Sequence, residues 1–198
     1  MATQATNVSV GKPKVTGAVF RAPLGTALPT SATATLAVAY ADMGYISDEG
    51  WTNSKTRETT EVKAWGGDTV LTPQTGKNDT FQMTFIESLN LEVLKAVQGD
   101  ANVSGTLAEG ITVMENSAEL DEAVWVIDTI MSGGVIKRTV LPRGKIIEID
   151  DVVYKDDEPV GYASTIQAYP DTSGNSHYEY IQAVTTEAVT PGEVTEGE

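Results

Sequence analysis

The sequence contains no cysteine and only one histidine, His177. Without thiols the chain can form neither disulfide bonds nor thiolate metal sites, and it has no cysteine nucleophile. A single histidine excludes His-pair zinc motifs, and a Ser-His-Asp triad would have to use His177. No G-x-S-x-G pattern supports such a triad, and the dinucleotide-binding glycine pattern and the P-loop pattern are both absent. The residues argue against an enzyme, with a hydrolase built on His177 as the enzymatic alternative, and we expect no cofactor.

Long apolar runs and basic residues are also scarce. The apolar run at 32–41 has about half of the ~20 residues that a membrane-spanning helix needs. The first residues contain no apolar segment, so we expect no secretory signal and a soluble protein made in a cytoplasm. The chain has 13 Lys and Arg against 28 Asp and Glu, a formal charge of −15. Such a surface repels DNA phosphates and anionic lipid, which excludes a DNA-gripping protein, although the charge is equally consistent with simple solubility.

The stretch 80–99 has the clearest secondary-structure pattern of the sequence, a strand followed by a helix. Its first part alternates, so Phe81, Met83 and Phe85 share the buried face of a strand. Its second part has helical spacing, which predicts a helix over 88–98 whose apolar face consists of Leu89, Leu91, Val93, Leu94, Ala96 and Val97. Ser88 or Asn90 can cap the start of this helix, and Gly99 can end it.

From residue 123 onward the pattern is that of an antiparallel meander. We predict strands at 123–131, 135–141, 145–155 with a bulge at 150–151, and 160–169, joined by turns at 132–134, 142–144 and 156–159. Together with the single helix this predicts a mainly β fold of two packed antiparallel sheets, sandwich- or barrel-like, with a long projecting loop and extended termini. Residues 1–16 form an extended N-terminal arm, 17–181 the β domain, and 182–198 an acidic, disordered tail.

A polar stretch at 47–65 is bracketed by two tryptophans and supports two interpretations. It is either a solvated hairpin whose tryptophans fold back on their own domain, or a projecting loop that docks on another subunit. In the second case the candidate inter-subunit contacts are Trp51, Lys55, Arg57, Lys63 and Trp65. A loop that becomes ordered only on docking would lose ~1–2 kcal/mol per residue in backbone entropy, which would keep free subunits apart.

Two charged clusters, one basic and one acidic, lie further along the chain. Lys137, Arg138, Arg143 and Lys145 form the densest basic patch of the sequence. This patch is either a solvated hairpin face or an electrostatic mate for Asp156, Asp157 and Glu158 on a neighbouring copy. With Asp150 and Asp151 the same acidic residues could in principle hold a cation, but they lack the spacing of a calcium loop, and a solvated turn is the simpler interpretation.

The order of these elements is similar to that of a known family. A polar loop, a strand FQMTFIE, a helix LNLEVLKAVQG and a later stretch VVYKDDEPVGYASTIQAYPD resemble the major tail proteins of long-tailed bacteriophages, especially those that infect actinobacteria. The resemblance covers roughly residues 10–181. The chain has a short acidic tail where some relatives carry an immunoglobulin-like domain, so a role in host-surface decoration is not implied.

The resemblance implies a structural virion protein, assembled in the host cytoplasm. Subunits would form six-membered rings that stack into a hollow tube, with the loop and the N-terminal arm joining adjacent rings. Growth would start on a tail-tip initiator around a tape-measure protein and stop at a tail terminator, and DNA would later pass through the lumen without specific binding. Candidates to line that lumen are Asp128, Thr129, Glu148, Asp150, Ser164 and Gln167. A monomeric β-sandwich binding module, such as an adhesin or baseplate module, is the alternative, and it predicts a compact subunit without projecting segments.

Overall fold

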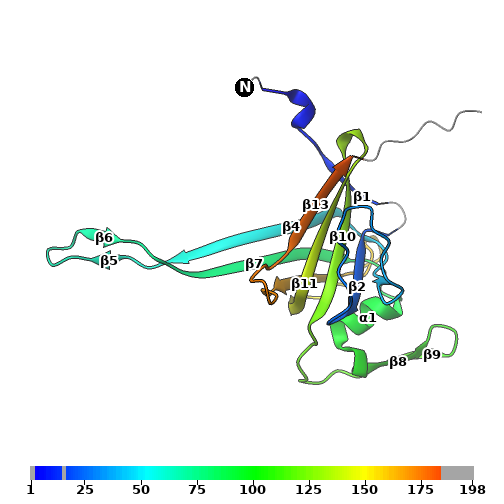
Figure 1. Ribbon diagram of the computed structural model, residues 1–198. Helices are drawn as coiled ribbons and strands as arrows, with labels where there is room; N and C mark the ends of the chain where they lie inside the picture. Colours follow the sequence, from blue (N-terminus) through cyan, green and yellow to red (C-terminus); the bar gives the residue numbers. More distant parts are fainter. Residues whose placement is uncertain (1–2, 15–16, 184–198) are drawn as a thin grey trace, which may run out of the picture.

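One long strand, β11, organises a mainly β fold that has one α-helix among the described residues (Figure 1). The computed structural model describes residues 3–14 and 17–183, so most of the predicted acidic tail lies outside the described residues. No helix within those residues is long and apolar enough to cross a membrane. The strands are β1 (Gly11–Pro13), β2 (Val19–Pro23), β3 (Ala41–Asp42), β4 (Ile46–Thr59), β5 (Val62–Lys63), β6 (Thr69–Leu71), β7 (Gln74–Phe85), β8 (Val103–Thr106), β9 (Gly110–Val113), β10 (Ala123–Met131), β11 (Val135–Ile149), β12 (Tyr162–Ala168) and β13 (Tyr178–Ala183). The helices are α1 (Leu91–Gln98) and the short 3-10 turns Ala5–Asn7, Asp100–Asn102 and Ser132–Gly134.

Nine strands form one antiparallel sheet in the order β3-β2-β10-β11-β12-β7-β4, with β1 added beside β10 and β13 beside β11. β11 pairs with β10 along one edge and, along the other, first with β13 and then with β12. The sheet folds over, so that Phe85 of β7 stacks on Trp125 of β10 with ring centroids 6.3 Å apart. The predicted two-layer packing is therefore present, but both layers belong to one sheet, which does not close into a barrel over the described residues.

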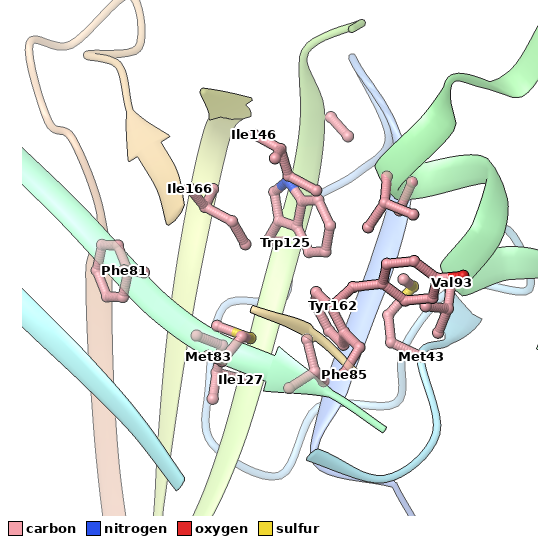
Figure 2. Close-up of a cluster of buried hydrophobic side chains, with 14 of the residues drawn as sticks. Met43, Phe81, Met83, Phe85, Val93, Trp125, Ile127, Ile146, Tyr162 and Ile166 are labelled. Atoms are coloured by element: carbon pink, nitrogen blue, oxygen red, sulfur yellow. The ribbon is translucent and has the colours of Figure 1, made fainter. Parts of the chain in front are cut away.

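The main core lies between these layers and α1 (Figure 2). Phe81, Met83 and Phe85 are buried, as the alternation predicts. β10 is buried on both faces over 123–127: Ala123, Trp125 and Ile127 face this core, and the side chains between them, Val124 and Val126, face a second cluster with Ala22, Tyr40 and Val140. Burial on both faces explains why β10 has a continuous apolar sequence rather than an alternating one.

Helix α1 begins and ends where its sequence indicates. The side chain of Asn90 accepts a hydrogen bond from the Glu92 backbone N–H at 3.0 Å, and Gly99 has a φ of 97°, a conformation that other residues resist. Val93, Leu94, Ala96 and Val97 are buried. Leu89 precedes the helix and is exposed, so its predicted place on the apolar face was wrong.

The turn predicted at 142–144 is wrong, because β11 runs through these residues to Ile149. Gly144 is required here by packing rather than by turning. The indole N–H of Trp125 donates to the Gly144 carbonyl at 3.2 Å, and a Cβ on Gly144 would lie 2.6 Å from Trp125 Cδ1. The register of β11 shifts twice, between Leu141 and Gly144 against β10 and between Ile146 and Glu148 against β12, and neither shift lies at the predicted bulge at 150–151.

Replacing Gly144 with alanine should therefore destabilise the fold. Because the new methyl group would displace the Trp125 ring in a packed core, we expect Gly144→Ala to lower the free energy of unfolding by about 1–3 kcal/mol in urea denaturation. Gly76→Ala is the matched control, since its Cβ would meet only the flexible side chain of Glu58. Equal stabilities of the two variants would contradict the packing role of Gly144.

Candidate assembly surfaces

The most prominent surface is a hairpin that projects from the body. β4 and β7 pair from Trp51 opposite Met83 out to Thr59 opposite Gln74, and the small β5–β6 ladder continues the ribbon (Figure 1). β12 supports β7 only over residues 80–85. We call residues 53–79 the projecting hairpin. The predicted projecting loop is therefore a ribbon of strands, and its threonines favour that extended conformation.

The two tryptophans have different surroundings. Trp51 stacks on Phe81 with centroids 5.9 Å apart, and its indole N–H donates to the Thr129 hydroxyl at 3.1 Å. It thus packs on its own subunit, which corrects the expectation that both tryptophans are available to a neighbour. Trp65 lies near the far end of the projecting hairpin and is fully exposed.

Trp65 belongs to a wider apolar tip. Val62, Val70 and Leu71, on the two short strands beside it, are also exposed. Lys63 follows Val62 on β5 and pairs with Glu61 of the same ribbon at 3.7 Å. A ribbon of two short strands is only marginally stable in water and cannot cover its own apolar side chains. Exposed apolar residues in such a place indicate an interaction site.

The predicted basic patch is largely neutralised within the subunit. Arg138 is buried and forms a bidentate pair with Asp128, with Nε–Oδ1 at 2.7 Å and Nη2–Oδ2 at 2.8 Å. Arg143 pairs with Glu122, Lys145 with Glu119 and Lys137 with Glu179, at 2.8, 2.8 and 3.0 Å. Arg138 therefore cannot reach a neighbour from this position.

The acidic loop after β11 remains exposed. Asp156, Asp157 and Glu158 are all exposed, and Glu158 pairs with Lys155 at 2.8 Å. Within 3–14 and 17–183, no group of three or more His, Asp or Glu side chains is arranged to hold a metal ion. The loop is an exposed, negatively charged surface.

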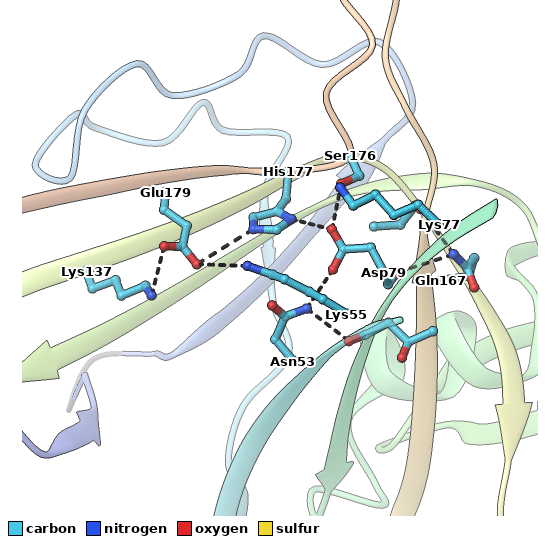
Figure 3. A network of polar contacts seen from close by, with 11 residues as sticks. Asn53, Lys55, Lys77, Asp79, Lys137, Gln167, Ser176, His177 and Glu179 are labelled. Atoms are coloured by element: carbon cyan, nitrogen blue, oxygen red, sulfur yellow. Dashed lines mark hydrogen bonds and ion pairs between the residues drawn. The ribbon is translucent and has the colours of Figure 1, made fainter. Parts of the chain in front are cut away.

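A polar network lies where the projecting hairpin leaves the body (Figure 3). Asp79 of β7 is only 2% exposed and accepts hydrogen bonds from Asn53 of β4 at 2.7 Å and from Ser176 at 2.6 Å. Nδ1 of His177 lies 2.6 Å from the same Asp79 carboxylate. The network joins both strands of the hairpin to the segment that leads into β13.

The surroundings of His177 bear on the hydrolase alternative. That alternative requires a buried carboxylate beside the ring, and Asp79 meets this requirement. It also requires a nucleophile at the other nitrogen, but Nε2 faces the Glu179 carboxylate at 3.7 Å. The imidazole edge packs against Phe81 with centroids 5.3 Å apart. The arrangement joins elements of the fold, and among the described residues no hydroxyl is recorded within hydrogen-bond distance of Nε2.

Comparison with known proteins identifies the family. A family model described as phage tail tube protein matches residues 1–191, almost the whole chain. The chain belongs to the phage tail tube protein family. No curated protein sequence matches it significantly.

Membership of this family makes the chain a structural subunit of the phage tail tube and a component of the virion tail. A tail tube is built by self-assembly, so the exposed tip and the acidic loop are its candidate contact surfaces. Three residues considered for the lumen, Asp128, Thr129 and Ser164, are buried within the subunit and cannot line a channel. Glu148 and Asp150 are exposed, and Gln167 is half-buried with its amide donating to the Asp79 carbonyl at 3.3 Å.

The acidic groups of the network have perturbed pKa values. Burial by itself raises the pKa of Asp79, but hydrogen bonds from Ser176 and Asn53 and the adjacent His177 ring outweigh burial, so the pKa lies below its ordinary value. Burial also raises the pKa of Glu179, and the hydrogen bond and charge of Lys137 reverse that effect. Both carboxylates are therefore more strongly stabilised as anions in the folded subunit than in the unfolded chain.

Removing the charge of Asp79 should weaken the fold. Asn at this position cannot accept the same set of short bonds, so we expect Asp79→Asn to lower the free energy of unfolding by about 2–4 kcal/mol in urea. Glu158→Gln, which alters an exposed pair, should change it by less than about 1 kcal/mol. If Asp79→Asn left the free energy of unfolding unchanged, the network would contribute little to stability.

The network should also make stability depend on acid pH. Because the folded pKa values of Asp79 and Glu179 are depressed, their contribution is complete above the unfolded values of about 4 and is lost as pH falls through the folded values. We therefore expect the free energy of unfolding to fall below about pH 4, and to fall less steeply in Asp79→Asn. Parallel curves for the two proteins, measured by urea denaturation across that range, would contradict this assignment.

Proposed function

We propose that this subunit polymerises as six-membered rings stacked into the tail tube, and that the projecting hairpin joins each subunit to a neighbouring copy. The observation that carries the proposal is the apolar tip around Trp65 at the end of a ribbon that extends away from the body. The monomeric binding module required a subunit without projecting segments, so the hairpin argues against that alternative.

The contacts that we propose between subunits follow the exposure of each residue. Trp65 and Lys63 at the tip, with Arg57 along the ribbon, contact the neighbour, and Asp156, Asp157 and Glu158 offer an acidic surface. Lys55 and Lys137 contribute only at the rim, because each already lies against Glu179 of its own subunit. Trp51 and Arg138 are no longer proposed as anchors, because each packs within its own subunit.

The net charge suits a conduit for DNA. A subunit with 13 basic and 28 acidic residues repels phosphate, so DNA could pass through a lumen without binding to its wall. We further propose that the tube grows in the host cytoplasm from a tail-tip initiator, around a tape-measure protein, until a tail terminator stops it. The subunit has no catalytic task in this scheme.

The tip can be tested by one substitution. Trp65 touches little of its own subunit, so Trp65→Ser should leave the melting temperature of the monomer unchanged. Removing a central aromatic anchor costs about 2 kcal/mol or more, which corresponds to roughly 30-fold weaker association. Electron microscopy of purified subunits mixed with a tail-tip seed should then show few or short tubes. Val38→Ser, at another fully exposed apolar residue on the body, is the control.

A deletion tests the whole tip. Removing residues 60–73 and joining Thr59 to Gln74, which face each other across the ribbon, through an Asn-Gly turn should leave a folded subunit. We expect this subunit to form no tubes and to remain monomeric in analytical ultracentrifugation. Tubes of normal length from the deleted subunit would overturn the docking role of the tip.

A further inference from the structure

We propose that residues 176–179 form a brace that sets the direction in which the projecting hairpin leaves the subunit, with Asp79 and His177 as positioning residues. The direction itself is a property of the single subunit. Its consequence for tube growth rests on the function proposed above.

The hairpin needs such a device because its own pairing cannot fix its direction. Support from β12 ends where Gln167 pairs with Thr80. Beyond that point the hairpin consists of two strands alone, and two-stranded ribbons twist and bend more than wide sheets. The contacts with the body past Thr80 that the structure records are concentrated at Lys55 and at residues 77–79.

The contacts of the brace come from both strands of the ribbon. On β7, Asp79 bonds to Ser176 and His177, and Lys77 donates to the Ser176 hydroxyl at 3.3 Å. On β4, Lys55 lies 4.0 Å from the Glu179 carboxylate. Because the brace contacts both strands at the same level, it resists rotation of the ribbon about its base as well as bending.

The brace is in turn anchored to the body. Glu179 of β13 receives the Lys137 ammonium of β11 at 3.0 Å, and β13 pairs with β11 from Tyr178 to Ala183. A continuous chain of contacts thus runs from Asp79 through His177 and Glu179 to Lys137 (Figure 3). The central link is short and buried, since the His177 side chain is 10% and the Asp79 side chain 2% exposed.

The length of the hairpin gives the brace leverage. About 14 residues separate Asp79 from Trp65, a span of roughly 45 Å for an extended strand. A tilt of about 10° at the base would therefore move the tip by roughly 8 Å, more than the spacing of two neighbouring strands. If only a fraction of subunits hold the tip in the binding direction, the apparent affinity falls to that fraction of its full value.

The absence of cysteine makes this direction measurable in the intact chain. Spin labels on Asp68→Cys near the tip and Glu148→Cys on β11 would report one distance by double electron–electron resonance, since both sites are exposed. We expect a narrow distance distribution in the otherwise unchanged protein, and a distribution that is broadened or shifted by several ångströms in His177→Ala. His177→Asn should restore much of the narrow distribution, because an amide N–H can still donate to Asp79.

Two further variants keep the test decisive. If His177→Ala does not fold, Ser176→Ala removes one contact of the brace and should broaden the distribution to a smaller extent. Lys155→Ala breaks an exposed pair elsewhere and should change nothing. An unchanged distribution in both His177→Ala and Ser176→Ala, with an unchanged melting temperature, would overturn the brace.

Tube growth separates this inference from the proposed function. Seeded elongation should be about tenfold slower if a tenth of His177→Ala subunits hold the braced direction. Normal elongation despite a broadened distribution would overturn the positioning role in assembly. Failure of the unmodified subunit to form tubes would instead overturn the proposed function, while the distance measurement would still decide whether the brace exists.

Discussion

A ribbon of two strands has no interior, so it can bury side chains only where it meets something else. The projecting hairpin satisfies this constraint at its base, where Asp79 is enclosed by the segment before β13, and the two strands that carry it satisfy it where Trp51 packs on Phe81. At its tip none of the residues that the structure describes covers Trp65, which is exposed to solvent. The subunit is thus well packed around β10 and β11 but leaves apolar side chains exposed at the tip of the hairpin. This arrangement is expected of a protein that self-assembles.

The sequence predicted those elements whose evidence is local. The residues around Phe81 alternate and those from Leu91 to Gln98 have helical spacing, whereas the strand from Ala123 to Met131 is recognisable as a continuous apolar run that ends at a glycine pair. The pattern failed at Gly144, because glycine can indicate either a turn or the close approach of a large ring. It also failed for β4, since a strand without a buried face has no alternation to distinguish it from a loop.

The candidate site was less predictable because its partners are distant in the chain. Asp79 and His177 are 98 residues apart, and neither lies in a recognisable motif. Trp51 and Trp65 looked equivalent as aromatic residues in a polar stretch, and only the fold separates the one that packs inward from the one that projects. The basic patch was visible as a sequence cluster, but its acidic partners at Asp128, Glu122 and Glu119 could be assigned only in three dimensions.

Charge pairing within the subunit also leaves the excess acidity for the outer surface, so copies repel one another until apolar contacts outweigh that repulsion.

The way in which β7 enters the body has a mechanical consequence. Over residues 80–83 this strand is hydrogen-bonded on both sides, to β4 and to β12, and β12 passes the connection to β11. A pull on the distal end of the ribbon acts along the strand axis, so the ladder bonds on both sides bear the force together rather than opening one after another. A load applied lengthwise through the projecting hairpin would therefore act on this subunit in shear, the direction in which the paired strands resist most.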